Sequence, residues 1–175
     1  MRRLLVTLDI ILMKIMKFAS YIAGICIALA AASICFEVFS RSIFNAPTEW
    51  TLEVTGYLVL IGGLLGFAPA LAADKHITVD LLTSHLSGKT NRILNIITMF
   101  IGLLFSVVLL VYGWDMVEAS YRLGRTSTST LHVPLFIPQT AVPTAGLLLI
   151  MQFLRKIIIS INSLTKKSGD QRQEV

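Results

Sequence analysis

The chain has 175 residues, of which 55% are hydrophobic and 14% are charged, with a mean hydropathy of +0.77 and a formal net charge of +5. A water-soluble domain of this size would carry far more charge, so the composition excludes that class and predicts an integral membrane protein. The segments outside the apolar runs are too short for a soluble catalytic domain, and we expect no enzyme activity.

Four runs without a charged residue follow one another at 18–36, 54–73, 93–114 and 126–154. A membrane-spanning helix needs about 20 apolar residues, so each of the first three runs fits one span. The fourth run is too long for one span, and Pro134, Pro138 and Pro143 indicate that it begins as a loop. We therefore expect an all-α integral membrane fold with four transmembrane helices, over about 18–40, 52–73, 93–114 and 138–161.

The segment 1–17 is apolar but has one polar side. Its polar helical face gathers Arg3, Thr7, Lys14 and Lys17. This pattern predicts an amphipathic helix in the membrane interface, with its lysines towards anionic lipid headgroups, or else a simple extension of the first span. A second short amphipathic helix is expected after Asp74, and 162–175 should form a polar cytoplasmic tail.

The basic residues are distributed unevenly over the two sides of the membrane. If both termini lie on one side, every Lys and Arg falls on that side except Arg41, Arg122 and Arg125. By the positive-inside rule, both termini should be cytoplasmic. The net positive charge is thus an orientation signal, and we expect no nucleic-acid partner, because the chain offers no basic face on a soluble module.

Acidic and basic residues gather at the expected outer side. Glu37 and Arg41 are one helical turn apart, as are Glu49 and Glu53, which flank Trp50. Glu49 and Glu53 lack further oxygen ligands for a cation, so we expect them to meet arginines instead. The candidates for docking a partner subunit or binding protein are Arg41, Glu49, Trp50, Glu53, Arg122 and Arg125.

The third helix is expected to continue past Trp114, out of the membrane. Charged residues recur at helical spacing beyond it, namely Asp115, Glu118, Arg122 and Arg125. Glu118 and Arg122 have the spacing of an intrahelical ion pair.

Small residues follow one side of the second span. They are Gly56, Gly63, Gly66, Ala70 and Ala73, and together they are called the small-residue stripe. Removing side chains along one face lets another helix approach closely, so the stripe predicts a helix-packing surface. Gly62 and Gly66 also form a G-x-x-x-G pair, which is a weak motif alone.

His76 and Asp80 lie one turn apart after the second span and are candidates for a structural role at the inner mouth. A metal site would need more ligands, so we expect no metal, cofactor, catalytic residue or substrate site in this chain. No predicted span carries an ionisable residue near its midplane, which favours a support for a transporter over the moving part. The alternative is a self-contained homo-oligomeric small exporter, for which Glu37 would be the membrane carboxylate.

Several residues in order resemble the small permease subunit of tripartite ATP-independent periplasmic (TRAP) transporters, the DctQ-like family. They are Arg41, Glu49, Trp50, Glu53, Gly66, the segment 74–80, Gly124, Ser127, the run 131–134, Pro143 and Gly146. The resemblance implies a complex in the bacterial inner membrane. In it, a large permease subunit carries sodium and substrate, and a periplasmic solute-binding protein delivers an organic acid. The small subunit would be a fixed brace among the membrane lipids, without a cofactor of its own.

Overall fold

The computed structural model describes the backbone of residues 2–73 and 88–170, and the side chains of most of them. Its helices are α1 (Arg2–Phe44), α2 (Trp50–Ala72), α4 (Gly88–Arg122), α5 (Phe136–Gln139) and α6 (Ala141–Asp170). The described segments contain one isolated antiparallel bridge, between Thr126 and Pro134, and no longer strand.

Four helices are long and apolar enough to cross a membrane, over Asp9–Phe44, Trp50–Ala72, Ile97–Arg122 and Phe136–Ile158. A helix satisfies its backbone hydrogen bonds within itself, which a lipid environment demands of any spanning segment. The predicted all-α membrane fold with four such helices is therefore confirmed. The α6 window is the most enclosed, with 39% of its residues buried against 11% in α1.

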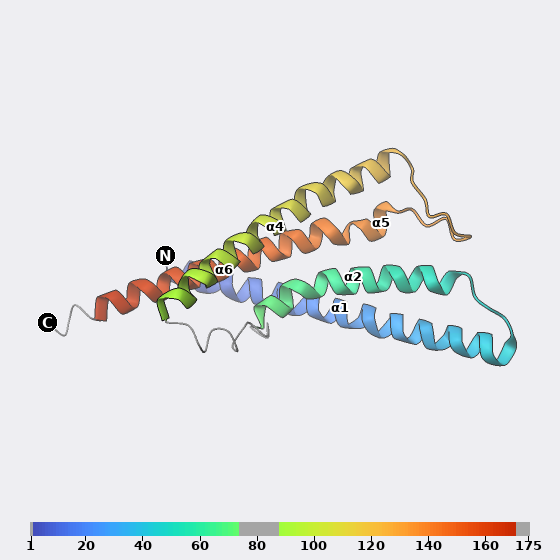
Figure 1. Cartoon of the computed structure of the whole chain (residues 1–175), viewed down its shortest axis with the longest axis horizontal. Helices are drawn as coiled ribbons and strands as arrows, with labels where there is room; N and C mark the ends of the chain where they lie inside the picture. The colour runs from blue at the N-terminus through green and yellow to red at the C-terminus, as the bar shows by residue number, and fades with distance from the viewer. Residues whose placement is uncertain (1, 74–87, 171–175) are drawn as a thin grey trace.

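The helices form two antiparallel hairpins, α1 with α2 and α4 with α6 (Figure 1). The hairpins pack together mainly through α2 and α6. They converge at the end where α1 begins and α6 finishes, which we call the termini end. They separate towards the opposite end, which carries the connections 45–49 and 123–135 and is called the loop end.

Three helices, α1, α4 and α6, extend well beyond the thickness of a bilayer core. At 1.5 Å per residue, the 43 residues of α1 span about 65 Å, against a hydrocarbon thickness of about 30 Å. Residues 2–17 and the first span form one continuous helix, as expected if this segment simply extends the span. The location of residues 2–17 in the membrane interface stays a prediction. The third helix continues past Trp114 as predicted, but it ends at Arg122, so Arg125 lies in the turn that follows. The helix α6 runs to Asp170, so residues 162–170 of the expected polar tail are helical.

The last helical segment is divided in two near its start. Pro143 has no N–H and so cannot donate the helical hydrogen bond to the carbonyl of Gln139. Accordingly α5 ends at Gln139, and α6 begins at Ala141. The Thr144 N–H still bonds to the Thr140 carbonyl at 3.2 Å, so the chain continues in nearly the same direction.

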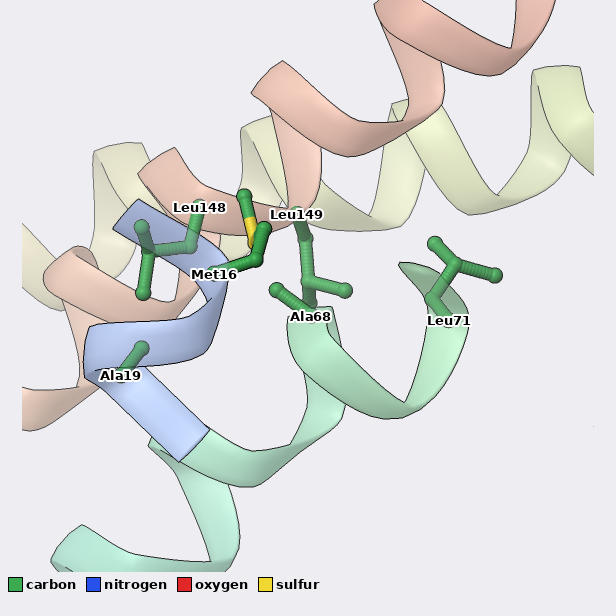
Figure 2. Packing of buried hydrophobic residues seen from close by; sticks show 6 residues of the cluster. All are labelled: Met16, Ala19, Ala68, Leu71, Leu148 and Leu149. Atoms are coloured by element: carbon green, nitrogen blue, oxygen red, sulfur yellow. The ribbon is translucent and has the colours of Figure 1, made fainter. Parts of the chain in front are cut away.

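The buried apolar core lies towards the termini end, where three helices meet. It consists of Met16 and Ala19 from α1, Ala68 and Leu71 from α2, and Leu148 and Leu149 from α6. Figure 2 shows Met16 between the α6 leucines and Ala68. Because Met16 is only 2% exposed, this contact fixes which face of α1 points inward.

Within each hairpin, glycine allows the two helices to approach closely. A Cβ on Gly62 of α2 would lie 3.0 Å from the Ile27 side chain and 3.1 Å from the Ala23 carbonyl oxygen of α1. A Cβ on Gly146 of α6 would lie 2.7 Å from the Leu110 backbone nitrogen of α4. Backbone contacts of this kind are typical of membrane helices, whose association depends on close packing.

Candidate subunit-interaction site

The connection between α1 and α2 is held by Glu37. Its carboxylate accepts a hydrogen bond from the Thr48 backbone N–H at 3.1 Å and another from the Thr48 hydroxyl. Arg41 Nη2 lies 3.3 Å from Glu37 Oε1, which confirms the pairing expected from their spacing. Glu37 therefore stabilises the turn at the loop end, away from the midplane where the exporter alternative would need a carboxylate.

Glu53 of α2 contacts the long connection between α4 and α5. It accepts a hydrogen bond from the Tyr57 hydroxyl at 2.6 Å and a second from the Ser129 hydroxyl. The sequence led us to expect arginine partners for Glu53, and the structure gives it hydroxyl partners instead. The reason is that Arg41 and Arg122 pair with acids one turn away on their own helices, the latter with Glu118 at 2.7 Å.

The connection 123–135 is folded so that its tip reaches α2. Its two arms are joined by backbone hydrogen bonds, from the Ser127 N–H to the Val133 carbonyl at 2.9 Å and from the Leu135 N–H to the Arg125 carbonyl at 3.0 Å. The turn includes His132 with a positive φ of 47°. This short two-armed loop carries Ser129 across the gap between the hairpins to Glu53 (Figure 1).

Five of the predicted docking residues are exposed at the loop end, and three of these make no ion pair within the described residues. Glu49 precedes α2 and makes no side-chain capping bond. Trp50 is 39% exposed, and its ring centroid lies 6.1 Å from that of Phe36. Arg125 is exposed in the turn after α4. Arg41 and Arg122 are also exposed but pair with acids of their own helices, and Glu53 is half-buried and makes the contacts described above.

The small-residue stripe of α2 lies mostly on an open side of the helix. A Cβ on Gly56 or Gly63 would find no atom within 4 Å. Ala70 and Ala73 are exposed, and Gly66 lies at the border, where its Cβ would be 3.8 Å from that of Ala23. The weaker G-x-x-x-G pair, Gly62 and Gly66, therefore faces α1, while most of the stripe has no partner within the described chain.

At the termini end, an ion pair connects α6 to α1. Arg155 Nε of α6 lies 2.5 Å from Asp9 Oδ1 of α1. Their separation of 146 positions leaves no local signal of this ion pair in the sequence. His76 and Asp80, the predicted residues at this end, lie outside the described residues.

Five polar side chains are buried within the described part of the chain. Gln152 of α6 is fully buried, and neither polar atom of its amide has a hydrogen-bond partner in the described structure. Ser106 of α4 is also buried, but its hydroxyl donates to the Gly102 carbonyl at 2.6 Å. In the described ranges no three His, Cys, Asp or Glu side chains come together as metal ligands.

Comparison with known proteins places the chain in a transporter family. A stretch of 79 residues is 24% identical to the sialic acid TRAP transporter permease protein SiaT of Haemophilus influenzae. This stretch is 45% of the present chain but 13% of that protein. Residues 30–162 match the model of the DctQ component of tripartite ATP-independent periplasmic transporters. Since this match covers most of the chain, including all of α2, α4 and α5, the chain belongs to the DctQ family of TRAP transporter subunits.

Proposed function

We propose that this chain braces a large permease subunit in the inner membrane, with both of its own termini in the cytoplasm. The large subunit would carry an organic acid together with sodium, and a periplasmic binding protein would deliver the acid. Family membership supports the transporter assignment, and the relative's description as a sialic acid permease suggests an acidic solute.

The observation that carries the brace role is the open small-residue stripe of α2. Gly56 and Gly63 leave the helix backbone uncovered, and within the described chain nothing packs over them. In a membrane, such a surface favours a second helix over lipid, because backbones can approach closely there. The charge-free middles of the four spans support the same role, since a coupled carrier usually holds ionisable groups at midplane depth.

The loop end would meet the binding protein. Glu49, Trp50 and Arg125 are exposed there, and the Glu53–Ser129 contact holds the connection 123–135 in one position. A rigid surface of this kind reduces the entropy lost on binding. The inner side of the chain would lie among lipid headgroups and the cytoplasm.

Reconstitution into vesicles tests this function. The chain, the large permease and the binding protein are combined with an inward sodium gradient, and uptake of radiolabelled sialic acid and of C4-dicarboxylates is measured. We expect uptake of one acid class only when all three components and sodium are present. Transport by this chain alone, abolished by Glu37→Gln, would instead establish the exporter alternative.

A further inference from the structure

The middle part of α1 has an outward side that begins with two basic residues and continues with large apolar ones. It comprises Lys14, Lys17, Phe18, Tyr21, Ile25 and Leu29, and is called the α1 strip. Both lysines are exposed, and the four apolar members are each more than half exposed. Their spacing keeps them on one side of a helix with 3.6 residues per turn.

The orientation of the α1 strip is fixed by contacts on the opposite side of the helix. Met16, Ala19 and Ala23 are buried there, and Met16 packs into the core with α2 and α6 (Figure 2). One turn before the strip, the ion pair between Asp9 and Arg155 ties the start of the helix to α6. The strip must therefore face the surroundings of the bundle.

Lys14 and Lys17 have no acidic partner within the described residues. Asp9 is the one acid in residues 1–36, and it is paired with Arg155. Within the described structure, neither lysine makes an ion pair or hydrogen bond with another side chain. The strip thus begins with two ammonium groups that no carboxylate of the described chain neutralises.

We propose that the α1 strip binds an anionic phospholipid, with its phosphate at Lys14 and Lys17 and its acyl chains along Phe18, Tyr21, Ile25 and Leu29. The strip is about 22 Å long, which matches one leaflet of a bilayer with its headgroups, about 20 Å. Clustered lysines at the membrane surface attract anionic lipids, and aromatic residues favour the boundary just below the headgroups.

A lipid fits the α1 strip better than a protein partner does. Helix–helix contacts in membranes favour small residues, as in the stripe of α2, whereas this strip presents four bulky side chains. Its charge is of one sign and stands at one end, as a phospholipid requires. Lipid binding at the α1 strip involves this chain alone and does not depend on the proposed transport function.

The test measures thermal unfolding of the purified full chain in a neutral detergent while phosphatidylglycerol is titrated in. We expect a saturable rise in Tm with phosphatidylglycerol and none with phosphatidylcholine, inorganic phosphate or soluble glycerol phosphate. Lys14→Gln/Lys17→Gln should weaken the apparent affinity on the order of tenfold, since each lysine contributes to surface attraction. Lys14→Arg/Lys17→Arg should keep it.

The matched control is Arg122→Gln/Arg125→Gln, which removes two charges at the opposite end and should leave the lipid response unchanged. Equal responses of the wild type and the double lysine variant would overturn the proposal, as would equal effects of phosphatidylcholine or of free phosphate. If the double variant does not fold, the two single variants are compared, and a wild-type response in both overturns it. Loss of permease co-purification with an unchanged lipid response would reassign the strip to a protein partner.

Discussion

Ser129 donates a hydrogen bond to Glu53 across 76 positions of sequence, and the contact links the two helical hairpins at their separated end. The apolar core lies at the other end, around Met16. The bundle is therefore held by packing near the termini and by a polar contact near the loops. That division explains how a surface loop rich in hydroxyl groups can have a defined position over a membrane domain.

The Glu53–Ser129 contact should contribute measurably to stability. Glu53→Gln and Ser129→Ala should each lower the Tm of the purified chain by a few degrees, since both remove a charge-assisted hydrogen bond. The double variant should be little worse than either single one, because partners in one bond are not additive. Glu49→Gln is the control, since Glu49 makes no capping bond and should leave the Tm unchanged. Additive losses would show that the two residues act separately.

Close packing of α4 against α6 should depend on Gly146. Gly146→Ala places a methyl group 2.7 Å from the Leu110 backbone nitrogen, and rigid backbone cannot yield without shifting a helix. We expect a loss of about 1–3 kcal/mol in unfolding free energy, the usual cost of overpacking. Gly24→Ala is the matched control, because its Cβ would meet nothing within 4 Å. Equal stability of the two variants in a detergent unfolding titration would contradict the observed packing.

The ion pair between Asp9 and Arg155 should hold the start of α1 against α6. Asp9→Asn should lower the unfolding free energy by about 1 kcal/mol, because the pair is partly exposed and Arg155 then loses its counter-charge. The exchanged variant Asp9→Arg/Arg155→Asp should recover part of that loss. Chemical unfolding at low and high salt measures the effect, which should shrink as salt screens it. An exchanged variant less stable than either single change would argue against a direct pair.

Gln152 is a fully buried amide without a partner in the described structure, and such a group costs about 1–3 kcal/mol when left unpaired. Gln152→Met keeps the length of the side chain and removes both polar atoms. The variant should therefore be at least as stable as the wild type in the same unfolding assay, with Gln152→Ala, which leaves a cavity, as the destabilised reference. A clear fall in Tm for Gln152→Met would show that the amide has a hydrogen-bond partner, such as an internal water.

Much of the architecture was predictable from the sequence, because a long apolar segment in a bilayer has to satisfy its own backbone hydrogen bonds and therefore forms a helix. The charge-free runs located four spanning helices, and local spacing predicted the ion pairs Glu37–Arg41 and Glu118–Arg122. What could not be predicted were contacts between distant residues, such as Asp9 with Arg155 and Ser129 with Glu53. Nothing local distinguishes a serine that bonds a remote carboxylate from any other serine in a polar loop.

The two glycine patterns of α2 show the same limit. Periodicity identified the small-residue stripe and the pair Gly62 and Gly66, but it could not say which side α1 would occupy. The structure assigns Gly62 to α1 and leaves Gly56 and Gly63 open. Which side of α2 stays open depends on where α1 packs, and that packing is set by the tertiary structure.

Affinity purification of the tagged chain from detergent-solubilised native membranes tests most directly whether this chain holds a large permease through the open side of α2. We expect a much larger permease to be recovered with the wild type and with Gly24→Leu. We expect this permease to be lost with Gly56→Leu/Gly63→Leu, which should fold normally because both positions are open. Recovery of the wild-type chain alone, as a stable oligomer, would show that it does not hold a large permease.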